Sequence, residues 1–419
     1  MGHLAPPLAP SDPGTDMPEI AEALARIAAL LHPLATERIA LDEAWGRICA
    51  ETLTARLTAP PFAVAAMDGY ALRWEDRRQV LRRVGVAQAG DPMGAPLAPG
   101  TCLRIFTGAP VPPLADTVVQ QERVATDGTC VRIGPDAEPF RHIRPAGSNL
   151  EGNAAIIQPG TRMSARDIGL AAAAGHARIL VHRRPRVAVL STGNELTDAF
   201  VEGRSGQILD ANRPALKALV RAWGGMPLDL GIVPDESARI SGRLAGLVEA
   251  ERPDLLVTSG GASVGDFDLV GPALDALGYR PAFSKVRMRP GKATMFGQLG
   301  ILPTLSLPGN SVSALVSALL FLRPALAMLG GAGPVDPPIE RALLATPLPA
   351  TGPRTTFLRG HLGVGPTGGL TFAVLPDQDT AMLSGLAGAD ALAVRPADAP
   401  PAGTGEPVAV LRFDLASGF

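Results

Sequence analysis

The sequence predicts a multidomain protein built around a mainly parallel α/β domain, with β-rich segments before and after it. The chain has 419 residues, which exceeds the length of one typical domain. Between residues 185 and 329, short apolar runs alternate with segments of helical periodicity, as in a parallel sheet covered by helices. Residues 60–160 and the region beyond residue 338 instead contain short apolar runs separated by Gly and Pro turns, which is typical of β-structure.

Individual elements follow from the spacing of apolar residues. Residues 17–31 carry apolar side chains at helical spacing and predict an amphipathic helix that ends before Pro33. In chain order, the other expected elements are strands at 103–106, 117–119 and 131–133, a helix at 164–175, strands at 186–190, 228–233 and 255–257, helices at 212–223, 236–250 and 268–277, and a helix at 312–322.

Composition and charge exclude several classes of function. The formal net charge of -2 gives no overall attraction to nucleic acid or to an anionic membrane, and the aromatic content of 4% offers few platforms for stacking bases. The 3 cysteines have no paired spacing, so neither a disulfide framework nor a zinc site is expected. The first 15 residues do not resemble a secretory signal, and the apolar run at 314–322 stops at Arg323-Pro324, too short to span a bilayer. We therefore expect a cytoplasmic protein without nucleic-acid or membrane partners.

Polar, turn-forming segments follow several of the expected strands. Residues 191–195, 258–268 and 306–311 each come directly after an apolar strand-like run, and the last of them opens a helix. The carboxyl ends of parallel strands meet at one edge of a sheet, where ligands bind. Gly-rich turns and helix N-termini present N–H groups to anions. The sequence therefore predicts an anionic ligand at this edge, although ordinary βα turns remain the alternative for each segment taken alone.

The turn after the third strand also carries two carboxylates, Asp266 and Asp268. Carboxylates beside a phosphate repel it unless a divalent cation lies between them, and Mg²⁺ prefers oxygen ligands of this kind. The pattern predicts a phosphorylated ligand bound together with a metal. A tight turn with solvated acids is the alternative.

A basic segment at residues 285–292 lies between two strand-like runs. Strand alternation would place Lys285, Arg287 and Arg289 on one face, where they could neutralise a phosphate or an oxyanion. The alternative is an exposed edge strand protected by its charges. The 6 histidines show no metal-ligand spacing, and no Ser/His/Asp set is evident.

A series of short motifs runs along the chain in a fixed order. The motifs are Ala-Met-Asp-Gly-Tyr-Ala at 66–71, Phe-Thr-Gly-Ala-Pro-Val-Pro at 106–112, Val-Val-Gln-Gln-Glu at 118–122, Ser-Thr-Gly-Asn-Glu-Leu at 191–196, Asp-Ala-Asn-Arg at 210–213, Ser-Gly-Gly-Ala-Ser-Val-Gly at 259–265 with Asp268, Pro-Gly-Lys at 290–292 and Leu-Pro-Gly-Asn at 307–310. Taken together, these motifs resemble those of a known family, the molybdopterin molybdenumtransferases, or MoeA family, which also includes the E domain of gephyrin. The resemblance extends over nearly the whole chain and rests on many motifs in one order.

The resemblance implies an elongated subunit that dimerises, with a site shared between the two subunits. It implies a linker domain formed by residues 17–51 and 154–184, and a β-rich domain at 52–153 inserted into it. It further implies an α/β molybdopterin-binding domain at 185–331 and a small C-terminal β-barrel domain at 332–419.

The resemblance also implies a reaction and its residues. In the last step of molybdenum cofactor biosynthesis, molybdenum from molybdate is inserted into adenylylated molybdopterin with a divalent metal such as Mg²⁺, and AMP is released. Implied partners are a second copy of the chain, a molybdopterin adenylyltransferase and recipient molybdoenzymes. Matched by motif, the catalytic residues are Asp68, Thr107, Glu195 and Asp268, with Glu195 and Asp268 also holding the metal. The residues that bind molybdopterin are Ser259, Gly260, Gly261, Ser263, Lys285, Arg289, Lys292, Pro308, Gly309 and Asn310.

Several positions depart from the family pattern. Asn149 and Asn194 stand where the family has carboxylates, and Arg289 and Ser311 replace a Lys and a Pro. A neutral amide lacks the charge that favours a divalent ion, and Arg is no simple substitute for Lys. These replacements favour an alternative hypothesis, a specialised non-catalytic paralogue that binds molybdopterin or the finished cofactor and delivers it to a molybdoenzyme.

Overall fold

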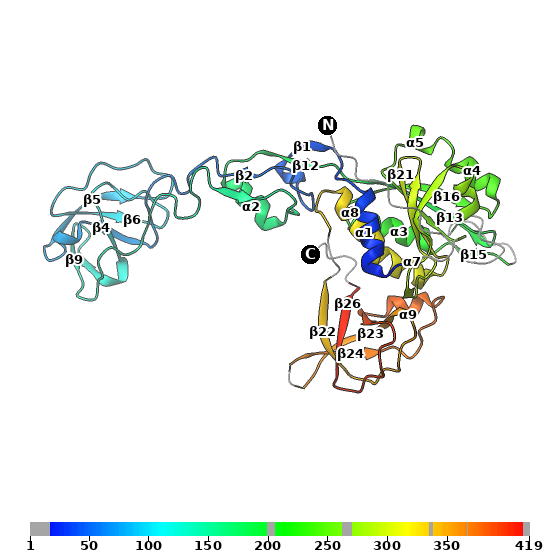
Figure 1. The fold of residues 1–419 in the computed structure, drawn as a ribbon. Coiled ribbons are helices and arrows are strands. Elements are labelled where there is room, and N and C mark those ends of the chain that lie inside the picture. Colours follow the sequence, from blue (N-terminus) through cyan, green and yellow to red (C-terminus); the bar gives the residue numbers. More distant parts are fainter. Residues whose placement is uncertain (1–16, 199–205, 262–269, 335–337, 367, 414–419) are drawn as a thin grey trace. The chain divides into compact units, whose positions relative to one another are not determined.

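The computed structural model describes residues 17–198, 206–261, 270–334, 338–366 and 368–413. They form two compact units (Figure 1). The first contains the chain up to Glu37, Gly46–Ala50 and the chain from Val181 onward, and the second contains Arg38–Trp45 and Glu51–Leu180. The multidomain α/β and β architecture expected from the sequence is confirmed, while the division into four domains at the stated boundaries stays a prediction.

A six-stranded sheet organises the first unit (Figure 1). Its order is β16-β13-β17-β21-β20-β18; the first four strands are parallel, and β20 pairs antiparallel with both β21 and β18, so it alone runs in the opposite direction. The predicted mainly parallel sheet is therefore confirmed. The strands are β16 (Met226–Val233), β13 (Arg186–Thr192), β17 (Leu255–Ser259), β21 (Leu302–Leu307), β20 (Met295–Leu299) and β18 (Tyr279–Phe283).

Helices cover both faces of this sheet, and alternate residues of each strand enter opposite cores. Val187 and Val189 pack with α1 (Ile20–Leu30), α3 (Asn212–Ala222) and α7 (Ser311–Ser317), whereas Ala188 and Leu190 pack with α4 (Ser237–Leu244) and α6 (Val270–Asp275). Burial on both faces explains why these strands read as continuous apolar runs. The helix expected at 236–250 is divided, because Gly246 takes a φ of 73° before α5 (Leu247–Ala250).

The apolar segment near residue 320 forms a longer helix than expected. It runs from Ser311 to Leu329 through α7, a π-helical turn at Ala318–Leu322 and α8 (Arg323–Leu329), so the predicted stop at Pro324 is wrong. We attribute the continuation to the wide π turn, which relieves the clash and the missing N–H donor of a proline. Among the described residues it is the one helix long and apolar enough to cross a membrane, but 94% of it is buried inside the fold. This helix lies in the same hydrophobic core as Val187 and Val189.

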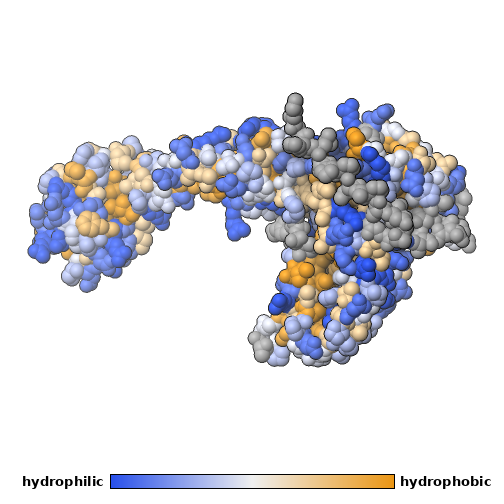
Figure 2. Space-filling model, viewed as in Figure 1, coloured by the Kyte–Doolittle hydropathy of each residue, from blue (hydrophilic) through white to orange (hydrophobic). Residues whose placement is uncertain are grey.

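A closed five-stranded barrel follows this helix, which confirms the predicted C-terminal β-barrel. Its order is β23-β24-β22-β26-β25, and β25 pairs back onto β23. Ala342 and Leu344 of β22 face the interior, while Ile339 and Leu343 are exposed where Figure 2 shows apolar surface over this strand. The elements are β22 (Ile339–Leu344), β23 (Thr355–Val364), β24 (Leu370–Val374), α9 (Leu383–Ala387), β25 (Ala391–Arg395) and β26 (Pro407–Arg412); β19 (Met288–Arg289) adds to β23.

The second unit is β-rich, as predicted. Its main sheet has the order β7-β4-β6-β5-β9-β8, and α2 (Ala165–Ala173) begins at a capping box made by Ser164 and Asp167. The main strands are β4 (Gly69–Leu72), β5 (Leu81–Ala87), β6 (Thr101–Ile105), β7 (Thr117–Gln120), β8 (Val124–Thr126) and β9 (Cys130–Ile133). Shorter strands of this unit are β2 (Leu53–Thr54), β3 (Val64–Ala65), β10 (Ile143–Arg144) and β11 (Ala155–Ile157). The paired strands β1 (Thr36–Ala40) and β12 (Arg178–His182) each contain residues of both units.

Candidate functional site

The topology of the first unit determines where a ligand can bind. The chain passes from β13 outward to β16 and then returns to the other side of β13 as β17, so the strand order reverses between β13 and β17. Ligands of open α/β sheets bind at the carboxyl ends of the strands beside such a reversal. A cavity of about 640 Å³ lies there, lined by the segments that follow β13, β16, β17 and β21. The predicted ligand edge is therefore a real cavity.

The turn after β17 requires glycine. Gly260 has a φ of 96°, and a Cβ there would lie 2.2 Å from the carbonyl oxygen of Thr192. Gly261 has a φ of 59°, and its Cβ would lie 2.5 Å from a methyl group of Val270. Ser259, Gly260 and Gly261 all line the cavity. The turn thus contributes backbone rather than side-chain atoms to this wall, as an anion cradle requires.

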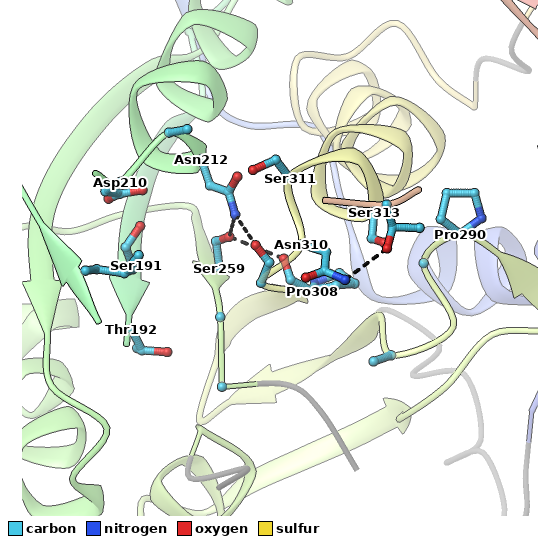
Figure 3. A pocket seen from close by; sticks show the side chains of 18 of the residues that line it. Ser191, Thr192, Asp210, Asn212, Ser259, Pro290, Pro308, Asn310, Ser311 and Ser313 are labelled. Carbon is cyan, nitrogen blue, oxygen red and sulfur yellow. Dashed lines mark hydrogen bonds between the residues drawn. The ribbon is translucent and has the colours of Figure 1, made fainter. Parts of the chain in front are cut away.

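The turn after β21 forms the adjacent wall. Pro308, Gly309 and Asn310 line the cavity, directly before α7. The side-chain amide of Asn212 ties this turn to the previous one, because Nδ2 donates to the Ser259 hydroxyl at 2.9 Å and to the Gly309 carbonyl at 2.7 Å (Figure 3). Two predicted loops that lie far apart in the sequence are therefore held together by a single side chain.

Cationic side chains line another part of the cavity. Arg289 and Lys292, two of the residues predicted to bind the ligand, line the cavity, and Arg354 reaches it from the C-terminal barrel. Lys285 does not line this cavity, and the expected strand is reduced to β19. Val286 and Met288 are buried and so confirm the alternation, while Arg287 forms an ion pair with Glu19 at 3.0 Å. The basic residues that remain in the cavity suit a phosphate or an oxyanion.

Two carboxylates, Glu195 after β13 and Asp235 after β16, also line the cavity. Burial and the negative charge of Glu195 raise the pKa of Asp235, while the nearby backbone of Asn194 and the hydroxyl of Thr192 act in the opposite direction. The Oδ1 atom of Asp235 is buried and has no hydrogen-bond partner among the described residues. A bound cation would reduce the repulsion between the two carboxylates and give this oxygen a partner, since Mg²⁺ prefers carboxylate oxygens.

Sequence reasoning missed Asp235, although a usable signal was present. The residue directly follows the predicted strand at 228–233, at the edge already chosen for the ligand. Asn194, interpreted as a replaced acid, does not line the cavity; its Oδ1 accepts a hydrogen bond from the Asp235 N–H at 3.1 Å. The amide therefore supports the segment that carries Asp235.

Asp210 lines the cavity too, but its carboxylate is occupied. Arg213 donates to it through Nε at 3.0 Å and also contacts Asp229 at 2.7 Å. This network fixes the start of α3 and leaves Glu195 and Asp235 as the available carboxylates of the described part of the cavity. The predicted residues Asp268 and Ser263 lie outside the described residues.

The predicted catalytic residues Asp68 and Thr107 belong to the second unit. The structure brings them together, because the backbone N–H and the hydroxyl of Thr107 both donate to Asp68 Oδ1 at 2.8 Å. These two hydrogen bonds lower the pKa of Asp68, and the charge of Arg104 acts in the same direction. The Arg104 guanidinium packs over the rings of Tyr70 and Phe106, 5.2 and 4.6 Å from their centroids. Asp68 is therefore an ionised, well-oriented group.

Comparisons with known proteins cover successive parts of the chain. Residues 18–175 match a family model described as MoeA N-terminal region (domain I and II). Residues 188–328 match a probable molybdopterin binding domain, and residues 341–413 match the MoeA C-terminal region (domain IV). The second match contains the strand ends, turns and acidic residues of the cavity described above.

Curated relatives and solved structures agree. A molybdopterin molybdenumtransferase of Haemophilus influenzae is 35% identical over 321 residues, which is 76% of this chain and 78% of that protein. Molybdopterin molybdenumtransferase 2 of Mycobacterium tuberculosis is 36% identical over 338 residues, 77% of this chain and 82% of that protein. The crystal structure of a molybdopterin biosynthesis MoeA protein from Pyrococcus horikoshii aligns with a TM-score of 0.79 and 27% identity over 95% of this chain and 100% of that chain. The fold and site thus define a protein with a molybdopterin-binding type of domain, and the chain belongs to the molybdopterin molybdenumtransferase (MoeA) family.

Proposed function

We propose that the protein inserts molybdenum from molybdate into molybdopterin in the last step of molybdenum cofactor biosynthesis, and that its substrate is the adenylylated form, with AMP as a product. Family membership supports the type of reaction. The structural observation that carries the proposal is the cavity of the first unit, which combines cationic side chains, glycine turns and a pair of carboxylates at one sheet edge. A phosphorylated substrate and an oxyanion need this combination.

The cationic side of the cavity is proposed to bind the anions. Arg289, Lys292 and Arg354 would contact the phosphate of molybdopterin and the molybdate oxyanion through charge-assisted hydrogen bonds. Arg289 suits bidentate contact with a phosphate or an oxyanion, whereas a Lys ammonium acts as a point charge. The replacement of a family Lys by Arg289 therefore preserves the charge and adds donors.

The carboxylate side fits the divalent metal that the family implies. Glu195 and Asp235 would hold Mg²⁺, because the buried Oδ1 of Asp235 otherwise has no partner among the described residues. No group of three or more potential ligands is positioned for a metal within the described residues, so oxygens of the substrate or of Asp268 would complete the coordination. When bound, the ion would neutralise phosphate charge beside these carboxylates.

Asp68 and Thr107 of the second unit are also proposed to act in the reaction. Thr107 holds Asp68 ionised and oriented, which suits a group that contacts the substrate. The alternative function, a non-catalytic carrier of molybdopterin or its cofactor, rests on the replaced acids. Asn194 gives it little support, because this side chain lies outside the cavity and supports the Asp235 segment.

The purified protein is expected to release AMP from adenylylated molybdopterin only when both molybdate and Mg²⁺ are present. The measurement is AMP formation with each component omitted in turn. Lys292→Ala should lower the rate by about tenfold or more, because it removes one charge-assisted contact to an anion. Tight binding of molybdopterin without AMP release under any of these conditions would favour the carrier function instead.

We also propose that the protein is a homodimer, which its family membership supports. Sedimentation velocity at micromolar concentration should give a species of twice the 43.2 kDa chain mass. A dilution series serves as the control, since a specific dimer of a closed symmetry shows no larger species as concentration rises. A single monomeric species throughout would contradict the proposal.

A further inference from the structure

Asn212 is a cavity-lining side chain with hydrogen-bonding capacity left over, because its Oδ1 atom has no partner among the described residues. It is the first residue of α3 and lies within the motif at 210–213. Its exposed fraction is 9%, and it lines the cavity together with the turns after β17 and β21. Contacts with these two turns determine both the position and the orientation of its side chain.

The orientation of the carboxamide follows from its partners. Nδ2 lies 2.7 Å from the carbonyl oxygen of Gly309, and a carbonyl oxygen can only accept a hydrogen bond. Nδ2 also lies 2.9 Å from the Ser259 hydroxyl. Exchanging the nitrogen and the oxygen would place two acceptors against each other at Gly309. Both hydrogens of the amide are therefore used in the clamp between the two turns.

The carboxamide oxygen is left over. Asn212 Oδ1 is buried and has no hydrogen-bond partner among the described residues. In Figure 3 it points away from Ser259, toward the side of the cavity where Ser311 is drawn. A buried acceptor without a donor carries a free-energy cost, and an unpaired polar group of this kind in a native structure calls for an explanation.

We propose that Asn212 both holds the two turns together and recognises the ligand: its Oδ1 atom accepts a hydrogen bond from an N–H or amino group of the pterin heterocycle. This inference rests on the proposed function. At neutral pH, molybdate and an ionised phosphate diester present acceptor oxygens, which cannot donate to Oδ1. The heterocycle, in contrast, carries ring N–H and amino donors. Asn212 would therefore distinguish a ligand with its heterocycle from an anion alone.

The test compares two probes on matched variants. Molybdopterin, titrated under anaerobic conditions, reports on the heterocycle and the phosphate together, and inorganic pyrophosphate, used as a competitor, reports on the anion cradle alone. Asn212→Ala removes the clamp and the acceptor, whereas Asn212→Asp removes the donating N–H groups but keeps an oxygen acceptor. The ratio of the two affinities cancels effects that the clamp or the added charge has on both anionic probes.

The expected result is a fall of about tenfold in the molybdopterin-to-pyrophosphate affinity ratio for Asn212→Ala, the value of one lost hydrogen bond to a buried acceptor, and a ratio for Asn212→Asp within about twofold of wild type. Gln298→Ala, an amide removal on β20 away from the cavity, should change neither affinity. Asn212→Ser repeats the truncation with a residue that favours a helix start, should Asn212→Ala fail to fold.

An unchanged molybdopterin-to-pyrophosphate affinity ratio in Asn212→Ala, or an equal fall in Asn212→Asp, would overturn the proposed recognition of the heterocycle. Asn212 would then only hold the two turns together. Wild-type protein that binds pyrophosphate but not molybdopterin would instead overturn the proposed function, and the inference with it. The two failures are thus distinguished by the wild-type titration.

Discussion

Asp235→Asn is expected to reduce the rate of AMP release by about 100-fold at moderate Mg²⁺, and to raise the Mg²⁺ concentration needed for half-maximal activity. The substitution keeps the size of the side chain and removes its charge, and the charge–charge attraction contributes strongly to the binding of a hard divalent ion. Asp235 lines the cavity beside Glu195, and its buried Oδ1 has no other partner among the described residues. The measurement is AMP release as a function of Mg²⁺ concentration.

The same substitution should leave the metal-free protein as stable as wild type or more stable. Burial and the charge of Glu195 raise the pKa of Asp235, so the folded state disfavours its carboxylate relative to the unfolded chain. An acid whose pKa is raised on folding costs stability at pH values above that pKa, and an amide removes this cost. Thermal unfolding without Mg²⁺ measures the difference. A gain in stability with a loss of activity is the signature of a functional carboxylate.

Asp229→Asn is the matched control, and its expected effect on stability has the opposite sign to that of Asp235→Asn. Although burial alone would raise it, hydrogen bonds from Lys217 and Arg213 hold the pKa of Asp229 at about 2. Its stabilising contribution is present above the ordinary pKa of an Asp and is lost as the pH falls toward 2, so the amide should destabilise the protein at neutral pH. Asp229 does not line the cavity. If Asp235→Asn behaved like Asp229→Asn, or kept wild-type activity, the assignment of Asp235 would be wrong.

The predictable part of this site is the part that local periodicity determines. Apolar runs located the strands, and the carboxyl ends of parallel strands must meet at one edge, so the turns at Ser259 and Pro308 were expected to lie together. Asp235 follows the same rule. It was missed because a lone Asp after a strand has no motif around it, not because the physical argument failed.

Contacts between distant segments have no comparable local signal. Arg354 and Thr380 line the cavity from the C-terminal barrel, and no periodicity in their own segments indicates that they lie beside the α/β sheet. Strand alternation correctly separated buried from outward residues at 285–289, but it does not reveal where the outward face points, and Lys285 does not reach the cavity. Likewise Pro324 is a reliable stop signal only when the preceding turn is α-helical, and here that turn is π-helical.

Loss of the Arg359 side chain should strongly lower the stability of the fold. It is 1% exposed on β23, and its guanidinium donates to three backbone carbonyls of the following loop. The acceptors are Met382 at 2.9 Å, Asp379 at 2.9 Å and Asp377 at 3.1 Å. This loop also carries Thr380, whose carbonyl accepts the N–H of Val312 and whose hydroxyl accepts from Asn310 at 2.9 Å. Arg359 thus fixes the loop that brings the barrel to the cavity.

Arg359→Leu is therefore expected to lower the free energy of unfolding by about 3–5 kcal/mol, because the side chain volume is largely kept while several buried carbonyls lose their donor. Arg359→Lys should recover part of the loss, since one ammonium cannot reach all three carbonyls in the geometry of the guanidinium fork.

Arg341→Leu, an exposed position on β22, should change stability by less than about 0.5 kcal/mol. Denaturant unfolding measures all three variants, and molybdopterin affinity should fall in Arg359→Leu because Thr380 loses its support. An Arg359→Leu protein as stable as Arg341→Leu would show that the loop is held by its other contacts, above all by Gln378, which accepts from the Arg359 N–H at 2.9 Å and donates to the Leu375 carbonyl at 2.8 Å.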